Sequence, residues 1–326
     1  MSDGRVVAVV GATGVVGEQM LRCLEARDFP VKSLLPLASA RSAGRSVRFR
    51  GADLPIQVLE DGAFPRCDIA LFSAGGSASR HFAPQAAAAG AVVIDNSSAW
   101  REDPEVPLVV PEVNAATMRE RSKGIIANPN CSTIQLVVAL APLHAHFHLE
   151  HVVVSTYQAV SGAGRKGLDA LEASRTRHVN EGVAGVDADL RIDWTLDEAT
   201  GYTEEELKVM RETRRILGAP SLNVTVSTVR VPVAVGHSES VWLRAKRPIT
   251  AAAATDILSQ SPGLAVVAHP DYPRPLAAAG QDPVFVGRIR DDLHQPGTLQ
   301  LWVVADNLLK GAALNAVQIA ERLARV

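Results

Sequence analysis

The stretch "RVVAVVGATGVVGEQMLRCLEA", residues 5–26, determines the fold of the first part of the chain. It begins with an apolar run that predicts a strand and ends in an amphipathic pattern that predicts a helix. Between them lie Gly11, Gly14 and Gly17, spaced three residues apart. Glycine here permits a tight turn and lets backbone N–H groups approach a pyrophosphate at the start of the helix. The stretch therefore predicts a dinucleotide-binding loop, although a tight strand-to-helix turn also uses glycine for purely structural reasons.

The alternation of strands and helices continues downstream. "VKSLLPLA" (31–38) and "CDIALFSAGG" (67–76) contain further strand candidates, and "PQAAAAGAVVIDNSS" (84–98) combines a helix, a glycine and a strand. Such alternation is typical of a parallel sheet with crossover helices. Later the chain carries long β-branched runs, "HVVVSTYQAV", "LNVTVSTVRVPVAV" and "ESVWLRAKRPI", which favour a mainly antiparallel sheet.

These patterns predict an α/β protein with two domains. Residues 1–127, completed by a terminal helix within 308–326, are expected to form a Rossmann-type doubly wound domain. Residues 128–307 are expected to form an inserted α+β domain with the mainly antiparallel sheet. A chain of 326 residues is long enough for each domain to bury a core of its own.

Composition excludes several classes of protein. A formal net charge of −2 and only 4% aromatic residues leave neither a basic surface nor a stacking platform for nucleic acid. No apolar run approaches the roughly 18 residues that span a bilayer, and the first residues enter a strand at once, unlike a targeting segment. Three cysteines argue against a disulfide framework and favour a reducing, cytoplasmic compartment.

The end of the second strand candidate indicates which dinucleotide would bind. NAD-dependent enzymes usually carry an acidic residue there for the ribose hydroxyls. Here the sequence reads "LASARSAG", with Arg41 and Ser42 and no acid. A cation and a hydroxyl suit the additional phosphate of NADP, so we predict NADP as the cofactor. The alternative is that Arg41 is an ordinary solvated loop residue.

Cys131, in "NPNCST", is the candidate nucleophile. It precedes an apolar helical stretch, and a thiol in the first turn of a helix lies at the positive end of the helix dipole, which favours the thiolate. Free cysteine is usually a small buried hydrophobe. That interpretation suits Cys23, which lies within the first helix, and Cys67, which opens a strand.

A thiolate nucleophile also needs an acid or base partner. Four histidines crowd "HAHFHLEH" (144–151), but without further ligands at suitable spacing they indicate a solvated helix end, and we predict no metal site. His237 differs because it follows a glycine just beyond a β-branched strand, where a loop can present an imidazole.

Ten motifs in one order carry a family resemblance: "GATGVVG", "LASARSAG", "FSAGG", "DNSSAWR", "VVPEVN", "NPNCST", "TYQAVSGAG", "GYTEEELK", "VRVPVAVGHSES" and "NLLKGAALNAVQIA". The set closely resembles the aspartate-semialdehyde dehydrogenase family over nearly the whole chain. The resemblance implies an oxidoreductase that reduces L-4-aspartyl phosphate to L-aspartate 4-semialdehyde with NADPH and releases phosphate. It further implies a place in lysine, diaminopimelate, threonine and methionine biosynthesis, and a homodimer built through the second domain.

The resemblance also assigns roles to individual residues. It implies that Cys131 forms the acyl-thioester, that His237 is the acid/base, and that Gln158 positions the substrate and the thioester. It implies substrate and phosphate contacts for Arg230 (α-carboxylate), Glu205 (amino group), and Arg101, Lys208 and Asn130 (phosphate). It implies cofactor contacts for Gly11, Thr13, Gly14, Val15, Val16, Gly17, Arg41, Ser42, Ser73, Ser161, Gly162 and Asn307.

The sequence departs from the family pattern at "HVNEGVAGVDADLRIDWTLDE", residues 178–198, so the local fold there and any dimer contacts it makes stay open. Two alternatives compete with the main interpretation. One is an N-acetyl-glutamyl-phosphate reductase, whose substrate has a blocked amine and would leave Glu205 less to do. The other is a catalytically silent NADP-binding relative, which would be expected to have lost Cys131 or His237.

Overall fold

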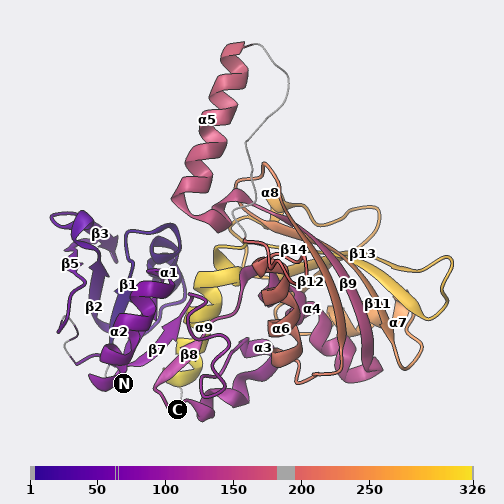
Figure 1. Ribbon diagram of the computed structural model, residues 1–326, viewed down its shortest axis with the longest axis horizontal. Helices are drawn as coiled ribbons and strands as arrows, with labels where there is room; N and C mark the ends of the chain where they lie inside the picture. The colour runs from indigo at the N-terminus through magenta and orange to yellow at the C-terminus, as the bar shows by residue number, and fades with distance from the viewer. Residues whose placement is uncertain (1–3, 63, 65, 182–194, 325–326) are drawn as a thin grey trace. The chain divides into compact units, whose positions relative to one another are not determined.

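The computed structural model describes residues 4–62, 64, 66–181 and 195–324 (Figure 1). The chain divides into two compact units, the first made of Met1–Asn130 and Ala312–Val326 and the second of Cys131–Gly311. Stretch 178–198, whose local fold the sequence left open, falls largely outside the described residues. In the described part of the chain, no helix has the length and apolar character needed to cross a membrane.

The first unit is built on a six-stranded sheet in the order β5-β2-β1-β6-β7-β8, and every pair in it is parallel. Its strands are β1 (Arg5–Val10), β2 (Val31–Ala38), β5 (Gln57–Val58), β6 (Ile69–Phe72), β7 (Val92–Asp95) and β8 (Ile125–Ala127). The central strand β6 is buried along its whole length. Continuous burial of this kind explains why these strands are apolar at successive positions.

Helices cover this sheet and a small hairpin adjoins it. The helices are α1 (Val15–Ala26), η1 (Ala40–Ser42), α2 (Gly76–Ala88), α3 (Pro111–Asn114), η2 (Ala115–Glu120) and the C-terminal α9 (Leu314–Ala324). The hairpin consists of β3 (Ser46–Phe49) and β4 (Ala52–Pro55). Helix α1 packs against both α9 and β3, so the C-terminal helix and the hairpin belong to the same core.

The loop from β1 to α1 requires glycine at two positions. Gly11 has a φ of +84°, and a Cβ there would lie 2.3 Å from the carbonyl oxygen of Ser73. A Cβ on Gly17 would lie 2.1 Å from the carbonyl oxygen of Gly11. Both contacts are far inside van der Waals distance, so any other residue would force the loop open.

The second unit contains a six-stranded sheet in the order β10-β9-β11-β14-β13-β12. Its strands are β9 (Leu149–Gln158), β10 (Asn223–Arg230), β11 (His237–Ala245), β12 (Leu264–Val267), β13 (Val284–Asp291) and β14 (Thr298–Ala305). The three central pairs are antiparallel, whereas the pairs at both edges, β10 with β9 and β12 with β13, are parallel.

The helices of the second unit are α4 (Cys131–Phe147), η3 (Val160–Ala163), α5 (Arg165–Glu181), α6 (Glu204–Ile216), α7 (Ala251–Ser259) and α8 (Pro275–Ala278). A π-helical turn, η4 (Leu309–Ala313), begins in this unit and runs into the first residues of the segment Ala312–Val326. Helix α4 packs against strands β9, β11, β13 and β14 and against helices α6 and α7, which buries most of its length. Helix α5 stands away from the sheet (Figure 1).

The predicted fold class is confirmed: a doubly wound parallel sheet is joined to an α+β unit whose sheet is mainly antiparallel. Cys23 and Cys67 are buried, as predicted for core residues. The β3–β4 hairpin and the parallel edges of the second sheet were not predicted.

Candidate active site

The side chains of the second sheet that share a face with His237 form rows across β10, β9 and β11. The strand register aligns these rows, and His237 comes level with Gln158 when the pairing of β11 with β9 is continued by one residue. The front row, at the end of the strands, consists of Arg230, Gln158 and His237. The second row, one step behind, consists of Thr228, Thr156 and Glu239. The next row is apolar, with Val226, Val154 and Val241.

Cys131 and His237 meet at this end of the sheet. Cys131 is the first residue of α4, and its Sγ lies 3.2 Å from Nε2 of His237, the first residue of β11. Cys131 is partly exposed, whereas the His237 side chain is fully buried. A thiol is thus held at the start of a helix, within hydrogen-bond distance of an imidazole and open to a ligand.

The tautomer of His237 follows from its second contact. The backbone N–H of Ala159 donates a hydrogen bond to Nδ1 at 2.9 Å. A backbone N–H can only donate, so Nδ1 carries the lone pair and the proton of the neutral ring is on Nε2, facing the sulfur. Burial lowers the pKa of His237 to about 3, and the charge of Arg230 lowers it further in the same direction. His237 is therefore a neutral hydrogen-bond donor.

Gln158 lies within a chain of polar contacts. Its Nε2 donates to Oε1 of Glu205 at 3.2 Å, and its Oε1 accepts a hydrogen bond from Oγ1 of Thr156 at 3.1 Å. Oε2 of the buried Glu205 is 3.9 Å from Nζ of Lys208, one turn further along α6. The amide of Gln158 is therefore fixed on both sides.

Helix α6 brings Glu205 and Lys208 to this chain of contacts. Thr203 caps the helix by accepting from the N–H of Glu206, and the Glu206 side chain accepts from the N–H of Thr203 in return. Oε1 of Glu206 also accepts from the N–H of Thr228 on β10 at 3.0 Å, which ties the start of α6 to the sheet. This capping box explains why the helix begins at "TEEE".

Arg230 is the cation of the front row. Its Nη1 donates to the carbonyl oxygen of Ala159 at 2.9 Å. A Cβ on Gly162 would lie 2.8 Å from that nitrogen and 3.4 Å from Cε1 of His237. Glycine at 162 therefore leaves room beside both front-row side chains. The guanidinium has five N–H groups, enough to hold a carboxylate as well.

Two other predicted residues of the second unit, Ser161 and Asn307, are buried and bonded to each other. The Asn307 Nδ2 donates to Ser161 Oγ at 2.9 Å, and its Oδ1 accepts from the N–H of Gly236 at 2.8 Å. Asn307 thus holds the residue directly before His237. Their role toward a cofactor stays a prediction.

Arg101 and Asn130 belong to the first unit. The Arg101 guanidinium donates to the carbonyl oxygens of Asn128 and Asn96, at 3.0 and 2.8 Å. Asn130 is buried and directly precedes Cys131 in the chain. Arg101 is thus bonded to the "NPN" segment that leads to the cysteine, and Asn130 lies within that segment.

The glycine loop of the first unit presents the remaining predicted cofactor residues. Gly14 occupies the N-cap position of α1 and brings no side chain to cap the first turn, which begins with Val15 and Val16. Thr13 Oγ1 lies 3.1 Å from the Oγ of Ser42, and Arg41 is exposed. Ser73, whose carbonyl oxygen approaches Gly11, follows β6 directly.

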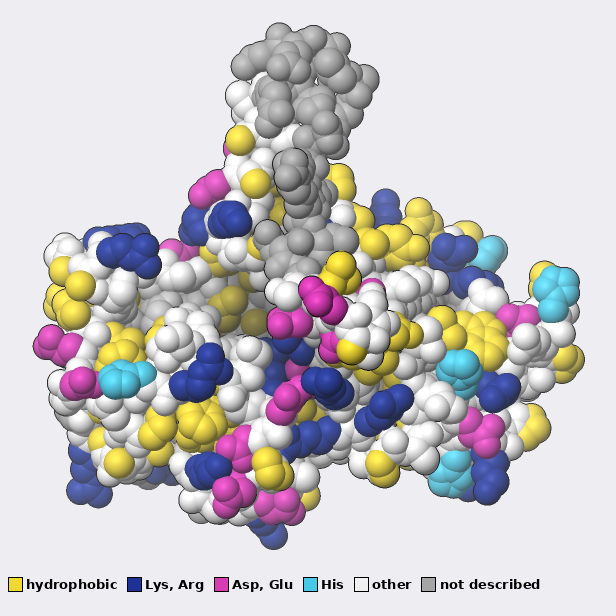
Figure 2. Space-filling model, viewed as in Figure 1, with side chains coloured by type: hydrophobic (Ala, Val, Ile, Leu, Met, Phe, Trp, Pro, Cys, Tyr) yellow, Lys and Arg dark blue, Asp and Glu magenta, His cyan; other side chains and the backbone are white. Residues whose placement is uncertain are grey.

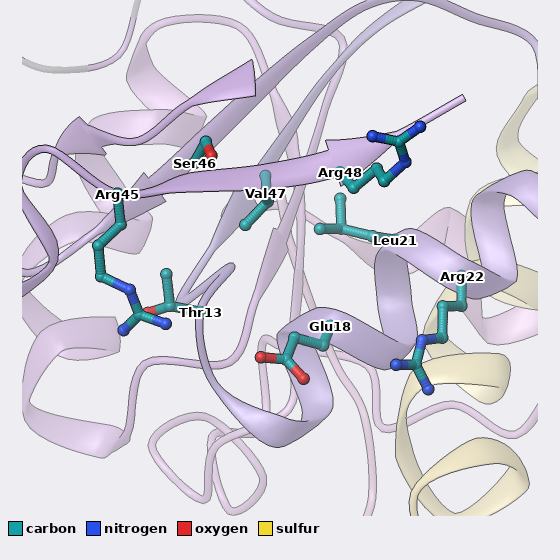
Figure 3. A pocket seen from close by; sticks show the side chains of 8 residues that line it. All are labelled: Thr13, Glu18, Leu21, Arg22, Arg45, Ser46, Val47 and Arg48. Atoms are coloured by element: carbon teal, nitrogen blue, oxygen red, sulfur yellow. The ribbon is translucent and has the colours of Figure 1, made fainter. Parts of the chain in front are cut away.

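A pocket of about 250 Å³ opens beside this loop, between α1 and the β3–β4 hairpin (Figure 3). It is lined by Thr13, Glu18, Leu21, Arg22, Arg45, Ser46, Val47 and Arg48. Arg45 extends toward Thr13. Three guanidinium groups and one carboxylate make the lining net cationic. Arg45 and Arg48 belong to none of the motifs identified in the sequence. The alternation in "RSVRFRG", residues 45–51, was the available signal for the strand that carries Arg48 and follows Arg45.

On the face shown in Figure 2, the described side chains form no second cluster of one charge. The face in Figure 2 intersperses cationic and anionic side chains and has no basic stripe. Among the described residues, no group of three or more His, Cys, Asp or Glu side chains is arranged to hold a metal ion.

A glycine loop on a parallel sheet and a thiol–imidazole pair are the parts of a dinucleotide-dependent dehydrogenase that works through a cysteine. Family models agree: residues 6–121 match the semialdehyde dehydrogenase NAD binding domain, and residues 140–310 match the semialdehyde dehydrogenase dimerisation domain.

Relatives that match the chain over nearly its full length show which family of semialdehyde dehydrogenases it belongs to. The aspartate-semialdehyde dehydrogenase of Aquifex aeolicus is 48% identical, with 98% of each chain covered. The crystal structure of aspartate semialdehyde dehydrogenase II from Vibrio cholerae, complexed with ASA, has a TM-score of 0.95 at 45% identity and 99% coverage of each chain. The enzyme of Candida albicans with NADP has a TM-score of 0.74 at 26% identity and 98% coverage of each chain. The chain belongs to the aspartate-semialdehyde dehydrogenase family.

Proposed function

We propose that the chain catalyses the NADP-dependent reduction of L-4-aspartyl phosphate to L-aspartate 4-semialdehyde, with release of phosphate, as a step in amino-acid biosynthesis. The observation that carries the proposal is Cys131 Sγ at the start of α4, 3.2 Å from the Nε2–H of a buried His237. The similarity to a structure complexed with ASA supports the choice of substrate.

The front row and helix α6 suit the two charged groups on the α-carbon of an aspartyl substrate. Arg230 supplies a guanidinium for the α-carboxylate, and Glu205 supplies a carboxylate for the ammonium group. Gln158, which already donates to Glu205, lies between them. Recognition of the ammonium by Glu205 favours an unblocked amino acid over an N-acetylated one, because an amide carries no charge to pair with a buried carboxylate.

Cys131 then performs the covalent step. The thiolate attacks the acyl carbon, the carbon–oxygen bond to phosphate breaks, and phosphate leaves with the electron pair, so that a thioester remains on the cysteine. Arg101, Lys208 and Asn130 are proposed to hold the phosphate. The Nε2–H of His237 donates to the sulfur in the resting state and to the negatively charged oxygen that develops during reaction. When bound, the reduced nicotinamide supplies the hydride.

The first unit fits a dinucleotide phosphate. The glycine loop leaves no room for a side chain at Gly11 or Gly17 and ends in the first turn of α1, which has no side-chain cap and whose backbone N–H groups are available to a pyrophosphate. The cationic pocket beside Thr13 suits the additional phosphate of NADP, and no acid follows β2 to repel it. We therefore propose Arg45, together with the predicted Arg41 and Ser42, as a determinant of NADP over NAD.

Arg45→Glu is expected to raise KM for NADP by about 10- to 100-fold, because a carboxylate would replace a cation next to the phosphate. The KM for NAD, which lacks that phosphate, is expected to change little. Steady-state kinetics with both cofactors checks this, with Arg119→Glu on exposed η2 as the charge-matched control. An equal rise of KM for NAD and for NADP would show that Arg45 does not contact the additional phosphate.

The activity itself is tested by incubating the protein with aspartate semialdehyde, phosphate and NADP and following NADPH absorbance. We expect turnover that depends on phosphate and is much faster than with N-acetyl-glutamate semialdehyde. Faster turnover of the N-acetylated compound would instead identify an N-acetyl-glutamyl-phosphate reductase. If neither compound were turned over and no acyl adduct formed on Cys131, the protein would be identified as a catalytically silent NADP-binding relative.

We also propose a homodimer formed through the outer face of the second sheet, the face opposite α4. Tyr157 and Val229 are large apolar residues exposed on it by 39% and 43%, and the ring of Tyr157 packs 5.4 Å from that of Trp302. Isolated exposed apolar residues are ordinary, but a cluster on one sheet face marks an interface. The match of residues 140–310 to a dimerisation domain supports this choice of face.

Ser240→Arg is expected to weaken this dimer, because Ser240 is exposed near the middle of that face, level with Ser155 and Trp302. Burying an unpaired guanidinium in an interface costs several kcal/mol, enough to shift the dissociation constant by about two to three orders of magnitude. Light scattering over a dilution series measures the change. Ser259→Arg, exposed on α7, is the control, and an unchanged dimer in Ser240→Arg would place the interface elsewhere.

The state of the cysteines indicates the compartment in which the protein works. Cys131 must stay reduced to act, and neither Cys23 nor Cys67 forms a disulfide. We therefore propose a reducing compartment, the cytoplasm, for this chain.

A further inference from the structure

Glu239 is a fully buried carboxylic acid that the proposed chemistry does not use. It lies in the second row, two residues after His237 on β11 and on the same face of the strand. Directly facing this region, α4 carries Gln135, also fully buried and one helical turn after Cys131. A turn of helix and two residues of strand advance by similar lengths, roughly 6 to 7 Å. The Gln135–Glu239 pair thus repeats the Cys131–His237 pair one step behind it.

The Gln135 side chain interacts with the Glu239 carboxyl group. Gln135 is close enough to lower the pKa of Glu239, yet all four of their side-chain nitrogen and oxygen atoms lie outside hydrogen-bond geometry with any partner. Level with Glu239 on the neighbouring strands are Thr156 on β9 and Val303 on β14, neither of which titrates. The titratable groups of the front row and of the first turn of α4 are His237, Arg230 and Cys131, and α4 also carries His144 and His146 in its last turn.

Burial determines the charge of this acid. Full desolvation raises the pKa of Glu239 well above its usual value, and the contact with Gln135 only partly opposes the shift. A neutral carboxyl can both donate to and accept from an amide, as a neighbouring glutamine requires. An ionised carboxylate would instead stabilise positive charge on the nearby imidazole. The neutral acid leaves His237 as the uncharged Nε2–H donor.

We propose that Glu239 and Gln135 are positioning residues that hold the first turn of α4 against the start of β11 and thereby keep the Cys131 thiol in front of the His237 Nε2–H. The inference rests on the proposed function in taking these two groups as the reacting pair. Polar pairs directly behind a reacting group commonly fix its geometry, and their loss costs activity without removing substrate contacts.

The first test measures the thiol rather than turnover. Alkylation of Cys131 by iodoacetamide, followed by intact mass across a pH series, reports both the reactivity of the sulfur and the midpoint of its ionisation. In Glu239→Leu and Gln135→Leu we expect the midpoint to rise by about one pH unit and kcat to fall about tenfold, with KM changed less than about twofold. Glu239→Gln, which keeps shape and neutrality, is expected to stay within about twofold of the unmodified protein.

Controls separate positioning from general destabilisation. Val241→Ala lies one row further along the same face and is expected to lower Tm without moving the alkylation midpoint. Cys131→Ala identifies the labelled residue. If the alkylation midpoint and kcat of Glu239→Leu and Gln135→Leu equalled those of the unmodified protein, the proposal would be overturned. If Glu239→Leu does not fold, Gln135→Leu and Glu239→Gln decide it. Because alkylation needs no substrate, a failure of the proposed activity would leave this readout intact.

A second readout tests the protonation state. The pKa of Glu239 is higher in the folded protein than the 4.5 of a free glutamate, so its contribution to stability is fully present below about pH 4.5 and is lost as the pH rises. Glutamine does not titrate. The Tm of Glu239→Gln relative to the unmodified protein is therefore expected to become more positive from about pH 4 to about pH 8. A difference that becomes more negative would indicate a paired, ionised carboxylate and would overturn the neutral-acid assignment.

Discussion

Cys131→Ser is expected to reduce kcat by at least about 10⁴-fold, because a serine hydroxyl at the same place does not ionise near neutral pH and cannot form a thioester. The fold should be retained, since serine has the shape of cysteine, is smaller and fits without a clash, and Cys131 is only partly buried. The semialdehyde assay measures the loss, and circular dichroism checks the fold. Mass spectrometry after mixing with aspartyl phosphate is expected to find an acyl adduct in the unmodified protein and none in the variant.

The chain supplies a matched control for this substitution. Cys23→Ser makes the same chemical change at a buried cysteine of α1. It is expected to lower the free energy of unfolding by about 1 to 3 kcal/mol, because a hydroxyl replaces a thiol in the core, and to leave kcat nearly unchanged. If Cys131→Ser kept a tenth or more of the activity, the covalent mechanism would have to be abandoned.

The fold could be predicted where the burial of a strand produces a simple pattern of apolar residues in the sequence. The continuous apolar strands of the first sheet and the alternating strands of the second distinguish a sheet covered on both faces from one with a single covered face. The β3–β4 hairpin escaped prediction because its strands are only four residues long and most of their residues are exposed, so they form no apolar run. The parallel edges of the second sheet are a property of connectivity, which residue patterns do not record.

The site could be predicted as a list of residues but not as an arrangement. Cys131 and His237 are 106 positions apart, and only the register of β9, β10 and β11 brings Gln158 and Arg230 into one row with His237. The hydrogen bond from Ala159 to Nδ1, which decides the tautomer, comes from a backbone group. No side-chain pattern could reveal it. The resemblance implied an acid/base, a role that stays a prediction, and the contact with Ala159 indicates that the neutral ring presents its Nε2–H to the sulfur.

His237→Ala is expected to lower kcat by about 10²- to 10³-fold, the usual loss when one donor to a developing oxyanion is removed. His237→Gln is expected to recover about tenfold of this loss, because its amide N–H can donate from nearly the position of Nε2. A glutamine cannot take up a proton. Recovery would therefore support donation, and a glutamine variant as inactive as the alanine variant would instead support proton transfer to the imidazole.

The pH dependence of kcat also distinguishes hydrogen-bond donation by His237 from proton transfer to it. Because the pKa of His237 is lowered to about 3 by burial and by Arg230, the imidazole is expected to stay neutral wherever the protein is active. The acid limb of kcat should then have the same midpoint in His237→Gln as in the unmodified protein. A limb near the ordinary histidine value of 6.5 that disappears in the variant would show that His237 titrates and would defeat the donor assignment.

The pH dependence of the free energy of unfolding tests the protonation state of His237 without a substrate. The pKa of His237 is lower in the folded protein than in the unfolded chain, so the unfolded state binds the proton first as the pH falls. The contribution to stability is fully present above about pH 6.5 and declines by roughly 1.4 kcal/mol per pH unit toward pH 3. His237→Gln removes this site and should flatten the acid side of the stability profile. Urea unfolding at several pH values measures the slope; an unchanged slope would mean that the buried imidazole is already protonated.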